Sequence, residues 1–318
     1  MARILVTGAN GFVGRALVPV LARDHAVVAA LRGDEEAPPA AAERRIVGNI
    51  GARTRWDAAL AGIDAVIHLA ARVHQPKRPD PDAFLEVNCA GTERLATAAR
   101  RAGVARFIFL SSVKVNGEAT GAVPFREDDP PHPVDAYAAS KWAAEQRLAG
   151  IAAAGGIEIV ILRPPLIYGP AAKANMHALV RLCQRGLPLP FGAVANRRSL
   201  LYLGNLVDAL GRVVAAPPRP GCRTYLLRDG DDLSTASLVR HLAAGLGRPP
   251  RLVSLPPAWL RAALVLAGRS GTADRLLGSL AVDDARFRRD FAWQAPFTAA
   301  EGLAETAAWY RRAAAVPG

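Results

Sequence analysis

The sequence has few cysteines. Cys89, Cys183 and Cys222 are the only three among 318 residues, and their spacing is not that of metal ligands. A disulfide-stapled secreted domain and a cysteine-held zinc site are therefore not expected. The low and odd cysteine count instead favours a cytoplasmic protein that binds no metal and buries these side chains as small hydrophobes.

Lysine is also scarce. The chain carries a formal charge of +12, yet only four of its 40 cationic residues are lysines. The arginines are scattered along the chain and form no basic tail, so we expect no nucleic-acid partner. A small anionic ligand accounts better for the charge.

Long apolar runs are missing. A stretch such as 262–268 is too short to span a bilayer and lies between Arg261 and Arg269. The N-terminal residues become glycine-rich after one short apolar run, which is unlike a signal peptide. We expect neither membrane insertion nor export.

What the sequence does have is an alternation of short apolar runs with helix-forming segments. The runs at 4–6, 27–31, 65–69, 107–110 and 157–162 are typical of strands, and the segments 91–102 and 136–149 of helices. This rhythm predicts an α/β fold whose doubly wound parallel sheet is covered on both faces. It loosens after Pro164 and Pro165, which indicates a smaller lobe beyond them.

A glycine-rich loop directly follows the first strand. Its members are Gly8, Asn10, Gly11, Phe12, Val13 and Gly14, with Ala9 between the first two. Gly8 permits the tight turn, Gly11 the close approach of a pyrophosphate, and Gly14 the packing of the next helix, whose N-terminus attracts negative charge. An ordinary turn is the alternative, but strand, helix and second strand all fall where a Rossmann dinucleotide site needs them.

This loop assigns the parts of the chain. We expect a dinucleotide-binding Rossmann domain over residues 1–165, with a later return near 199–228. The smaller α/β lobe, over 166–198 and 229–318, is then expected to bind the substrate.

The end of the second strand bears on the choice of cofactor. An NAD site usually offers an acidic residue there to the ribose hydroxyls, whereas this sequence has Arg32. A guanidinium suits the extra phosphate of NADP(H), which we favour, with NAD(H) and a solvated loop arginine as alternatives. Asn49, with Ile50 after it, follows the expected third strand 45–47 and is a candidate for the adenine edge.

Tyr137 and Lys141 stand four residues apart, hence on one face of a helix. A phenol is too weak a base at neutral pH, but a nearby cation favours the phenolate, so we expect Lys141 to lower the pKa of Tyr137. Ser112 ends the strand 107–110, at the sheet edge where ligands bind, and is expected to donate a hydrogen bond to a substrate oxygen. These three are the candidate catalytic residues, although Tyr-x-x-x-Lys alone also occurs by chance.

Taken together, the glycine loop, His68-Leu69-Ala70-Ala71, Asn88, Ser112, Tyr137-x-x-x-Lys141 and Arg163-Pro164-Pro165 resemble the extended short-chain dehydrogenase/reductases over essentially the whole chain. The sequence is most similar to the UDP-glucose 4-epimerase-like branch of the NAD-dependent epimerase/dehydratase family. This resemblance implies cofactor contacts from Leu69, Ala70, Ala71, Asn88, Tyr137, Lys141, Pro164 and Leu166. It further implies that a UDP-sugar contacts Arg72, Lys114, Asn116, Asn175, Leu189, Phe191 and Arg198, and it allows a homodimer.

The residues after Ser112 restrict the reaction. The dehydratases and decarboxylases of this superfamily carry an acidic residue there, whereas Val113 and Lys114 follow Ser112 here. Hydride transfer at C4 of the sugar is therefore expected. Because Arg32 favours the reductant NADPH, we favour a 4-keto-UDP-sugar reductase over a UDP-glucose or UDP-N-acetylglucosamine 4-epimerase. A regulator that senses NADP without catalysis is the third hypothesis, against which Ser112, Tyr137 and Lys141 argue.

Overall fold

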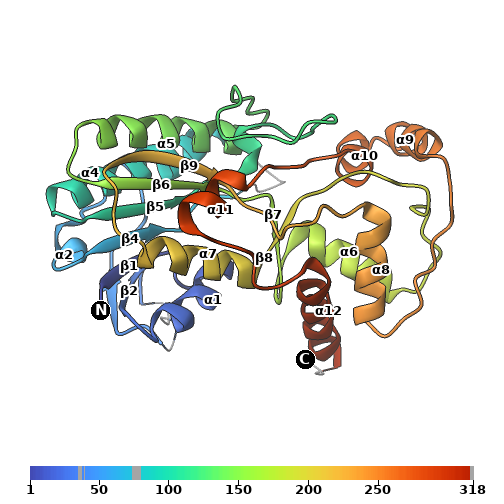
Figure 1. The fold of residues 1–318 in the computed structure, drawn as a ribbon, viewed down its shortest axis with the longest axis horizontal. Helices are drawn as coiled ribbons and strands as arrows, with labels where there is room; N and C mark the ends of the chain where they lie inside the picture. Colours follow the sequence, from blue (N-terminus) through green and yellow to red (C-terminus); the bar gives the residue numbers. More distant parts are fainter. Residues whose placement is uncertain (35–37, 39, 74–79, 316–318) are drawn as a thin grey trace.

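The computed structural model of the chain describes residues 1–34, 38, 40–73 and 80–315. A seven-stranded sheet, parallel throughout, has the order β3-β2-β1-β4-β5-β6-β9 (Figure 1). Its strands are β1 (Arg3–Thr7), β2 (Ala26–Leu31), β3 (Glu43–Ile46), β4 (Ala65–His68), β5 (Arg106–Leu110), β6 (Glu158–Arg163) and β9 (Gly221–Leu226). The chain reverses its direction of winding between β1 and β4, and a doubly wound sheet binds its ligand at that point.

Helices cover both faces of this sheet, because side chains along each strand alternate between them. Ile4 and Val6 pack with α1 (Phe12–Leu21), α7 (Leu203–Ala215) and α11 (Ala285–Phe291). Leu5, on the opposite face, packs with α2 (Asp57–Leu60), α4 (Gly91–Arg101) and α5 (Ala136–Ala153). The expected doubly wound Rossmann fold is thereby confirmed.

The smaller lobe has its own core beside the large sheet. A two-stranded parallel sheet of β7 (Leu166–Tyr168) and β8 (Leu200–Tyr202) packs against α6 (Ala174–Gln184), α8 (Thr235–Gly245) and α12 (Ala299–Ala315). Two further helices, α9 (Pro257–Leu266) and α10 (Ser270–Leu277), lie at the end of this lobe farthest from the large sheet (Figure 1). The remaining short elements are α3 (Pro81–Phe84), a π-helical turn at Leu85–Ala90 and a 3₁₀ turn at Val113–Val115.

The segment 199–228, which we expected to return to the Rossmann domain, begins with a strand, β8, that belongs to the smaller sheet. β8 pairs with β7, and the chain returns to the large sheet only with α7 against α1 and β9 beside β6. Sequence alternation reveals a strand without revealing its partner, which depends on contacts distant in sequence. Within the described residues, no helix has both the length and the apolar character needed to cross a bilayer.

A buried ion pair joins the long helix α5 to the centre of the sheet. Arg163, at the end of β6, donates to Glu145 of α5 with an Nη2–Oε2 distance of 2.6 Å, and both side chains are 3% exposed. Ser111, after β5, donates its hydroxyl to the same carboxylate. Breaking such a pair leaves an uncompensated charge in the interior, whereas removing both partners costs much less.

This ion pair predicts a stability pattern in urea unfolding. Arg163→Met should lower the free energy of unfolding by about 3–5 kcal/mol because it leaves the Glu145 carboxylate buried without its cation. The double variant Glu145→Met/Arg163→Met should recover most of that loss. Arg147→Met is the surface control: its side chain is 63% exposed and lies 3.8 Å from Glu93, so about 1 kcal/mol or less is expected. Equal losses in the single and double variants would contradict a dominant role of the pair.

Candidate active site

The glycine loop packs as tightly as the sequence predicts. Gly8 has φ +68°, a conformation that favours glycine, and a Cβ on it would lie 2.9 Å from the amide nitrogen of Ala70. A Cβ on Gly14 would lie 2.3 Å from the carbonyl oxygen of Gly8. The first turn of α1 therefore sits against the end of β1, with its free amide groups at the mouth of the crevice. A helix N-terminus placed in this way suits a pyrophosphate.

A single cavity of about 2240 Å³ runs from this loop into the smaller lobe. That volume exceeds an ordinary drug-sized pocket of roughly 300–1,000 Å³ and leaves room for two ligands end to end. It gathers most of the candidate residues: Gly8, Asn10, Gly11, Phe12, Val13, Gly14, Arg32, Asn49, Ile50, Leu69, Ala70, Ala71, Arg72, Ser112, Lys114, Tyr137, Lys141, Pro164, Leu166, Asn175 and Arg198. These residues come from both lobes and line one continuous cavity surface.

Four candidates do not line the cavity. Asn88 is buried and holds the backbone of Arg72 through two hydrogen bonds of 2.8 and 2.9 Å, so it shapes the wall from behind. Asn116 is 2% exposed and is occupied by Arg163 and by the carbonyl of Arg126. Leu189 and Phe191 belong to the core of the smaller lobe. The expected cofactor contact of Asn88 and the expected substrate contacts of Asn116, Leu189 and Phe191 therefore stay predictions.

Ser112 and Tyr137 meet in the middle of the cavity. Ser112 follows the end of β5, and its hydroxyl, which accepts from the amide of Lys114 at 3.2 Å, is close enough to the phenol of Tyr137, in the first turn of α5, to lower its pKa. The Asp135 carboxylate starts that helix by accepting from the amide of Ala138 at 2.7 Å. Burial, reinforced by the charge of Asp135, raises the pKa of Tyr137 to about 12 despite the nearby Ser112 hydroxyl. Without a bound cofactor, Tyr137 is a protonated phenol.

Lys141 does not lower that pKa as we expected. Its ammonium is buried, donates to the carbonyl of Leu110 at 2.8 Å and lies 4.4 Å from the centre of the Phe109 ring. Burial lowers the pKa of Lys141 to about 7, although Glu145 opposes this shift. Near neutral pH the amine is therefore only partly charged, and its nitrogen lies 6.0 Å from the centre of the Tyr137 ring.

Two arginines approach each other at the far end of the cavity. Arg198 donates to the carbonyl of Gly278 at 3.0 Å, and Arg275 of α10 lines the same wall. Burial lowers the pKa of Arg198, and the charge of Arg275 lowers it further. Two nearby guanidinium groups in a half-buried site are stabilised by an anion. Sequence reasoning found Arg198 through the family motif but missed Arg275, which no local pattern marks.

Lys114 also lines the cavity, but carboxylates already surround it. Its ammonium lies 2.7 Å from both Glu118 and Asp135. Burial lowers the pKa of Lys114, but these hydrogen bonds outweigh it and raise the pKa above its ordinary value. Lys114 therefore compensates the charges of Glu118 and Asp135.

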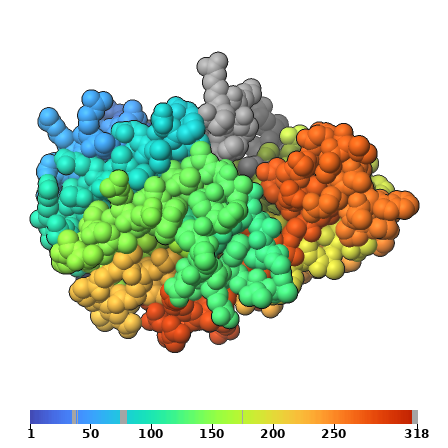
Figure 2. Space-filling model, turned by 90° about the horizontal axis from the view of Figure 1, so that it is seen from above, coloured from blue at the N-terminus to red at the C-terminus, as the bar shows by residue number. Residues whose placement is uncertain are grey.

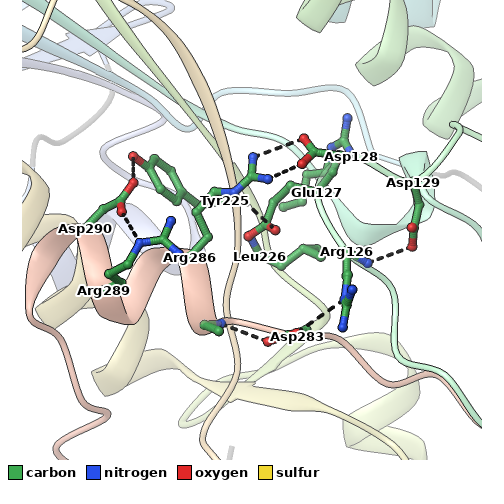
Figure 3. A network of polar contacts seen from close by, with 12 residues as sticks. Arg126, Glu127, Asp128, Asp129, Tyr225, Leu226, Asp283, Arg286, Arg289 and Asp290 are labelled. Carbon is green, nitrogen blue, oxygen red and sulfur yellow. Dashed lines mark hydrogen bonds and ion pairs between the residues drawn. The ribbon is translucent and has the colours of Figure 1, made fainter.

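The loop between Ser112 and Tyr137 is held in place by a polar network with α11 (Figure 3). Arg286 pairs with Asp128 and lies 3.6 Å from Glu127, whose carboxylate accepts from the amide of Leu226 at 3.1 Å. Arg126 lies 3.6 Å from Asp283. This network fixes the loop that carries Asp135, so it supports the entry to α5 from outside the cavity.

Comparison with known proteins identifies the family of the chain. Residues 4–225 match the model of the NAD dependent epimerase/dehydratase family. The chain is 40% identical to a UDP-glucose 4-epimerase of Vibrio cholerae, over 96% of this chain and 94% of that protein. It is 30% identical to an N-acetyl-alpha-D-glucosaminyl-diphospho-ditrans,octacis-undecaprenol 4-epimerase of Escherichia coli O157:H7, over 80% of this chain and 75% of that protein. The solved structure of MoeE5 with UDP-glucose and NAD superposes with a TM-score of 0.77 at 27% identity, covering 98% of this chain and 100% of that one.

The burial of the Lys141 amine predicts that this residue lowers the stability of the folded protein at neutral pH. Because its folded pKa of about 7 lies below the ordinary 10.5, charging the buried amine costs stability in full below pH 7, and this cost vanishes as the pH rises toward 10.5. Lys141→Met should therefore raise the melting temperature of the cofactor-free protein at neutral pH by roughly 5 °C. The gain should shrink steadily toward alkaline pH.

Lys173→Met is the matched control, since Lys173 is exposed. Its melting temperature should follow that of the parent at every pH. A stabilisation by Lys141→Met that does not change with pH would mean that the buried amine carries no titration penalty.

Proposed function

The chain belongs to the NAD-dependent epimerase/dehydratase family, and we propose that within it the protein is a UDP-hexose 4-epimerase that uses NAD. One observation carries the proposal. A single cavity joins the glycine loop, the Ser112–Tyr137 pair and Arg198, in the order in which a dinucleotide, a reacting sugar carbon and a diphosphate would have to follow one another. UDP-glucose is the first candidate substrate, because an epimerase of that name matches nearly the full length of the chain.

This proposal reverses the order of the two hypotheses that the sequence left open. Arg32 favoured NADP(H) and with it a reductase, but the similar structure of MoeE5 holds NAD, and the comparisons give no support to NADP(H). Arg32 itself is exposed at the edge of the cavity. An arginine there is compatible with either cofactor. The epimerase is therefore preferred over the 4-keto-sugar reductase.

The residues present fit a dinucleotide. The glycine loop at Gly8 and Gly14 has no room for a side chain, and the amide groups of α1 face the cavity. Asn49 and Ile50 line the adenine end, and Leu166 lines the nicotinamide end. When bound, NAD would supply the acceptor for the hydride from C4 and the positive charge of its ring.

In this proposal, Tyr137 moves the proton of the C4 hydroxyl. Its pKa of about 12 means that it holds its own proton until a positive charge stands beside it. Base function is then confined to the cofactor-loaded enzyme. Ser112, close to the phenol, orients the same hydroxyl and donates to the ketone oxygen that forms at C4. This paired geometry also argues against a sensor without catalysis, which would need neither contact.

The carboxylates near the site have a different role. Asp135 and Glu118 are both bound by Lys114, so neither is available as the acid that an elimination needs. This agrees with a reaction that only moves a hydride and a proton. Lys141, between Leu110 and the cavity, is suited to donate to the ribose of the cofactor and to orient it.

Epimerisation requires that C4 receive the hydride on its other face. The sugar must therefore turn over inside the cavity while the nucleotide remains bound. A diphosphate gripped by Arg198 and Arg275 would act as the pivot, because the bonds that link it to the sugar rotate freely. The large cavity volume gives the ring space to turn.

The test is conversion of UDP-glucose to UDP-galactose, followed by proton NMR with no added reductant. We expect equilibration of the two sugars, and release of NAD when the protein is denatured. Tyr137→Phe should lower the rate by about 10²–10⁴-fold while the cofactor stays bound, since only the proton carrier is removed. Tyr225→Phe is the control, because Tyr225 bonds Asp290 outside the cavity. A product that forms only when NADPH is consumed would contradict the epimerase and support the 4-keto-sugar reductase instead.

The diphosphate site can be tested separately by calorimetry with UDP. Arg198→Ala should weaken UDP binding about 10- to 150-fold, the equivalent of about 1.5–3 kcal/mol for charge-assisted hydrogen bonds. Its neighbour Arg197 is the matched control: this side chain is 52% exposed, pairs with Asp232 and does not line the cavity. Equal effects of the two substitutions would move the diphosphate away from Arg198.

A further inference from the structure

Helix α9 is unusual in this structure because it buries none of its residues fully. Its sequence is apolar apart from Arg261, and it is ten residues long. Leu260 and Leu264 face the protein and are half-buried. The opposite face consists of Trp259, Ala262, Ala263 and Leu266, which are all exposed and have the i, i+3, i+4, i+7 spacing of one helical stripe. An apolar stripe therefore points away from the protein.

The exposed apolar surface continues around this helix. Val253 and Leu255, in the segment leading to α9, are 47% and 38% exposed. Trp259, Val265 and Leu266 are 72%, 51% and 88% exposed. We call these five residues the α9 patch. Apolar side chains gain free energy when they leave water, and a contiguous exposed patch of this kind is typical of an interaction surface.

Three arginines flank the α9 patch in the sequence. Arg248 and Arg251 precede it and Arg269 follows α9, and all three side chains are exposed. In the described part of the chain, no carboxylate pairs with these three, whereas Arg261 is paired with Asp274 at 2.6 Å. The whole chain is strongly basic, with a formal charge of +12. The partner of this surface should therefore be apolar inside a negatively charged boundary.

We propose that the α9 patch docks on the surface of an anionic lipid bilayer. Trp259, Val265 and Leu266 would enter the boundary between headgroups and acyl chains, and Arg248, Arg251 and Arg269 would lie among the headgroup phosphates. A tryptophan beside aliphatic residues with basic neighbours is the composition of helices that lie in this boundary. The helix is too short to span the bilayer.

A second copy of the chain fits this surface less well. A two-fold contact would bring the same patch of both copies together. The arginines that flank one patch would then face those of the other, and like charges across an interface cost binding energy. A bilayer of anionic lipids offers the opposite charge to all three arginines at once.

Docking would also fix how the cavity is oriented relative to the bilayer. Leu264 of α9 and Arg269 after it line the cavity wall, with Arg275 of α10 nearby. In the space-filling view, this segment forms the orange projection at the end of the molecule away from the large sheet (Figure 2). The end of the cavity that is proposed to bind the UDP diphosphate would then lie close to the bilayer surface, while the large sheet stays in water.

The experiment is sedimentation of the purified full chain with vesicles of phosphatidylglycerol and phosphatidylethanolamine, and with vesicles of phosphatidylcholine alone. Binding to the anionic vesicles only, weakened by salt, is expected. The fluorescence of Trp259 should shift to shorter wavelength on binding, since the other four tryptophans are buried or half-buried. Trp259→Ser/Leu266→Ser should reduce binding at least tenfold and leave turnover of UDP-sugars unchanged, because neither residue lines the cavity.

A matched pair of substitutions separates the α9 patch from the general charge of the protein. Val265→Ser should weaken vesicle binding, whereas Val123→Ser, on a valine 71% exposed outside the patch, should not. No binding to anionic vesicles at low salt would overturn the proposal, as would equal binding by Val265→Ser and Val123→Ser. A dimer that is lost in Trp259→Ser/Leu266→Ser would also overturn it, because the patch would then contact a second copy.

Discussion

The candidate active site depends on one buried carboxylate. Glu145 lies one turn beyond Lys141 on α5 and accepts hydrogen bonds from Arg163 of β6 and from Ser111 after β5. These contacts hold α5 against the ends of β5 and β6, and β5 delivers both the Leu110 carbonyl and, directly after it, Ser112. Arg163 also reaches Asn116, which binds the loop that carries Asp135. Tyr137 and Lys141 therefore keep their places because the helix below them is fixed by charge in an interior without water.

The same interior sets the chemistry of the site. It makes Tyr137 a weaker acid and Lys141 a weaker base than either is in water, so neither side chain is ready for catalysis by itself. Ligands complete the site: a positive charge near the phenol and an anion between Arg198 and Arg275 would each relieve an electrostatic cost that the empty protein bears. The proposed reaction would then depend on occupancy of both ends of the cavity.

The fold was predictable where the signal is local. The alternation of strands and helices and the glycine loop specify the doubly wound sheet, and Ser112, Tyr137 and Lys141 carry a spacing that only a strand end and a helix face can use. Three kinds of information were not local. The pairing of β8 with β7 depends on contacts across the lobe, and Leu189 and Phe191 are apolar residues whose burial no pattern distinguishes from a ligand contact. The pKa of Lys141 depends on how deeply α5 packs, which composition does not express.

In the proposed epimerase reaction, the hydride that leaves C4 of the sugar is the one that returns to it. UDP-glucose labelled with deuterium at C4 tests it directly, because an epimerase has no other source of hydrogen for that carbon. With the enzyme as isolated and no added reductant, mass spectrometry should find UDP-galactose that retains the deuterium at C4. Loss of the label from C4, or no product until NADPH is supplied, would contradict the account.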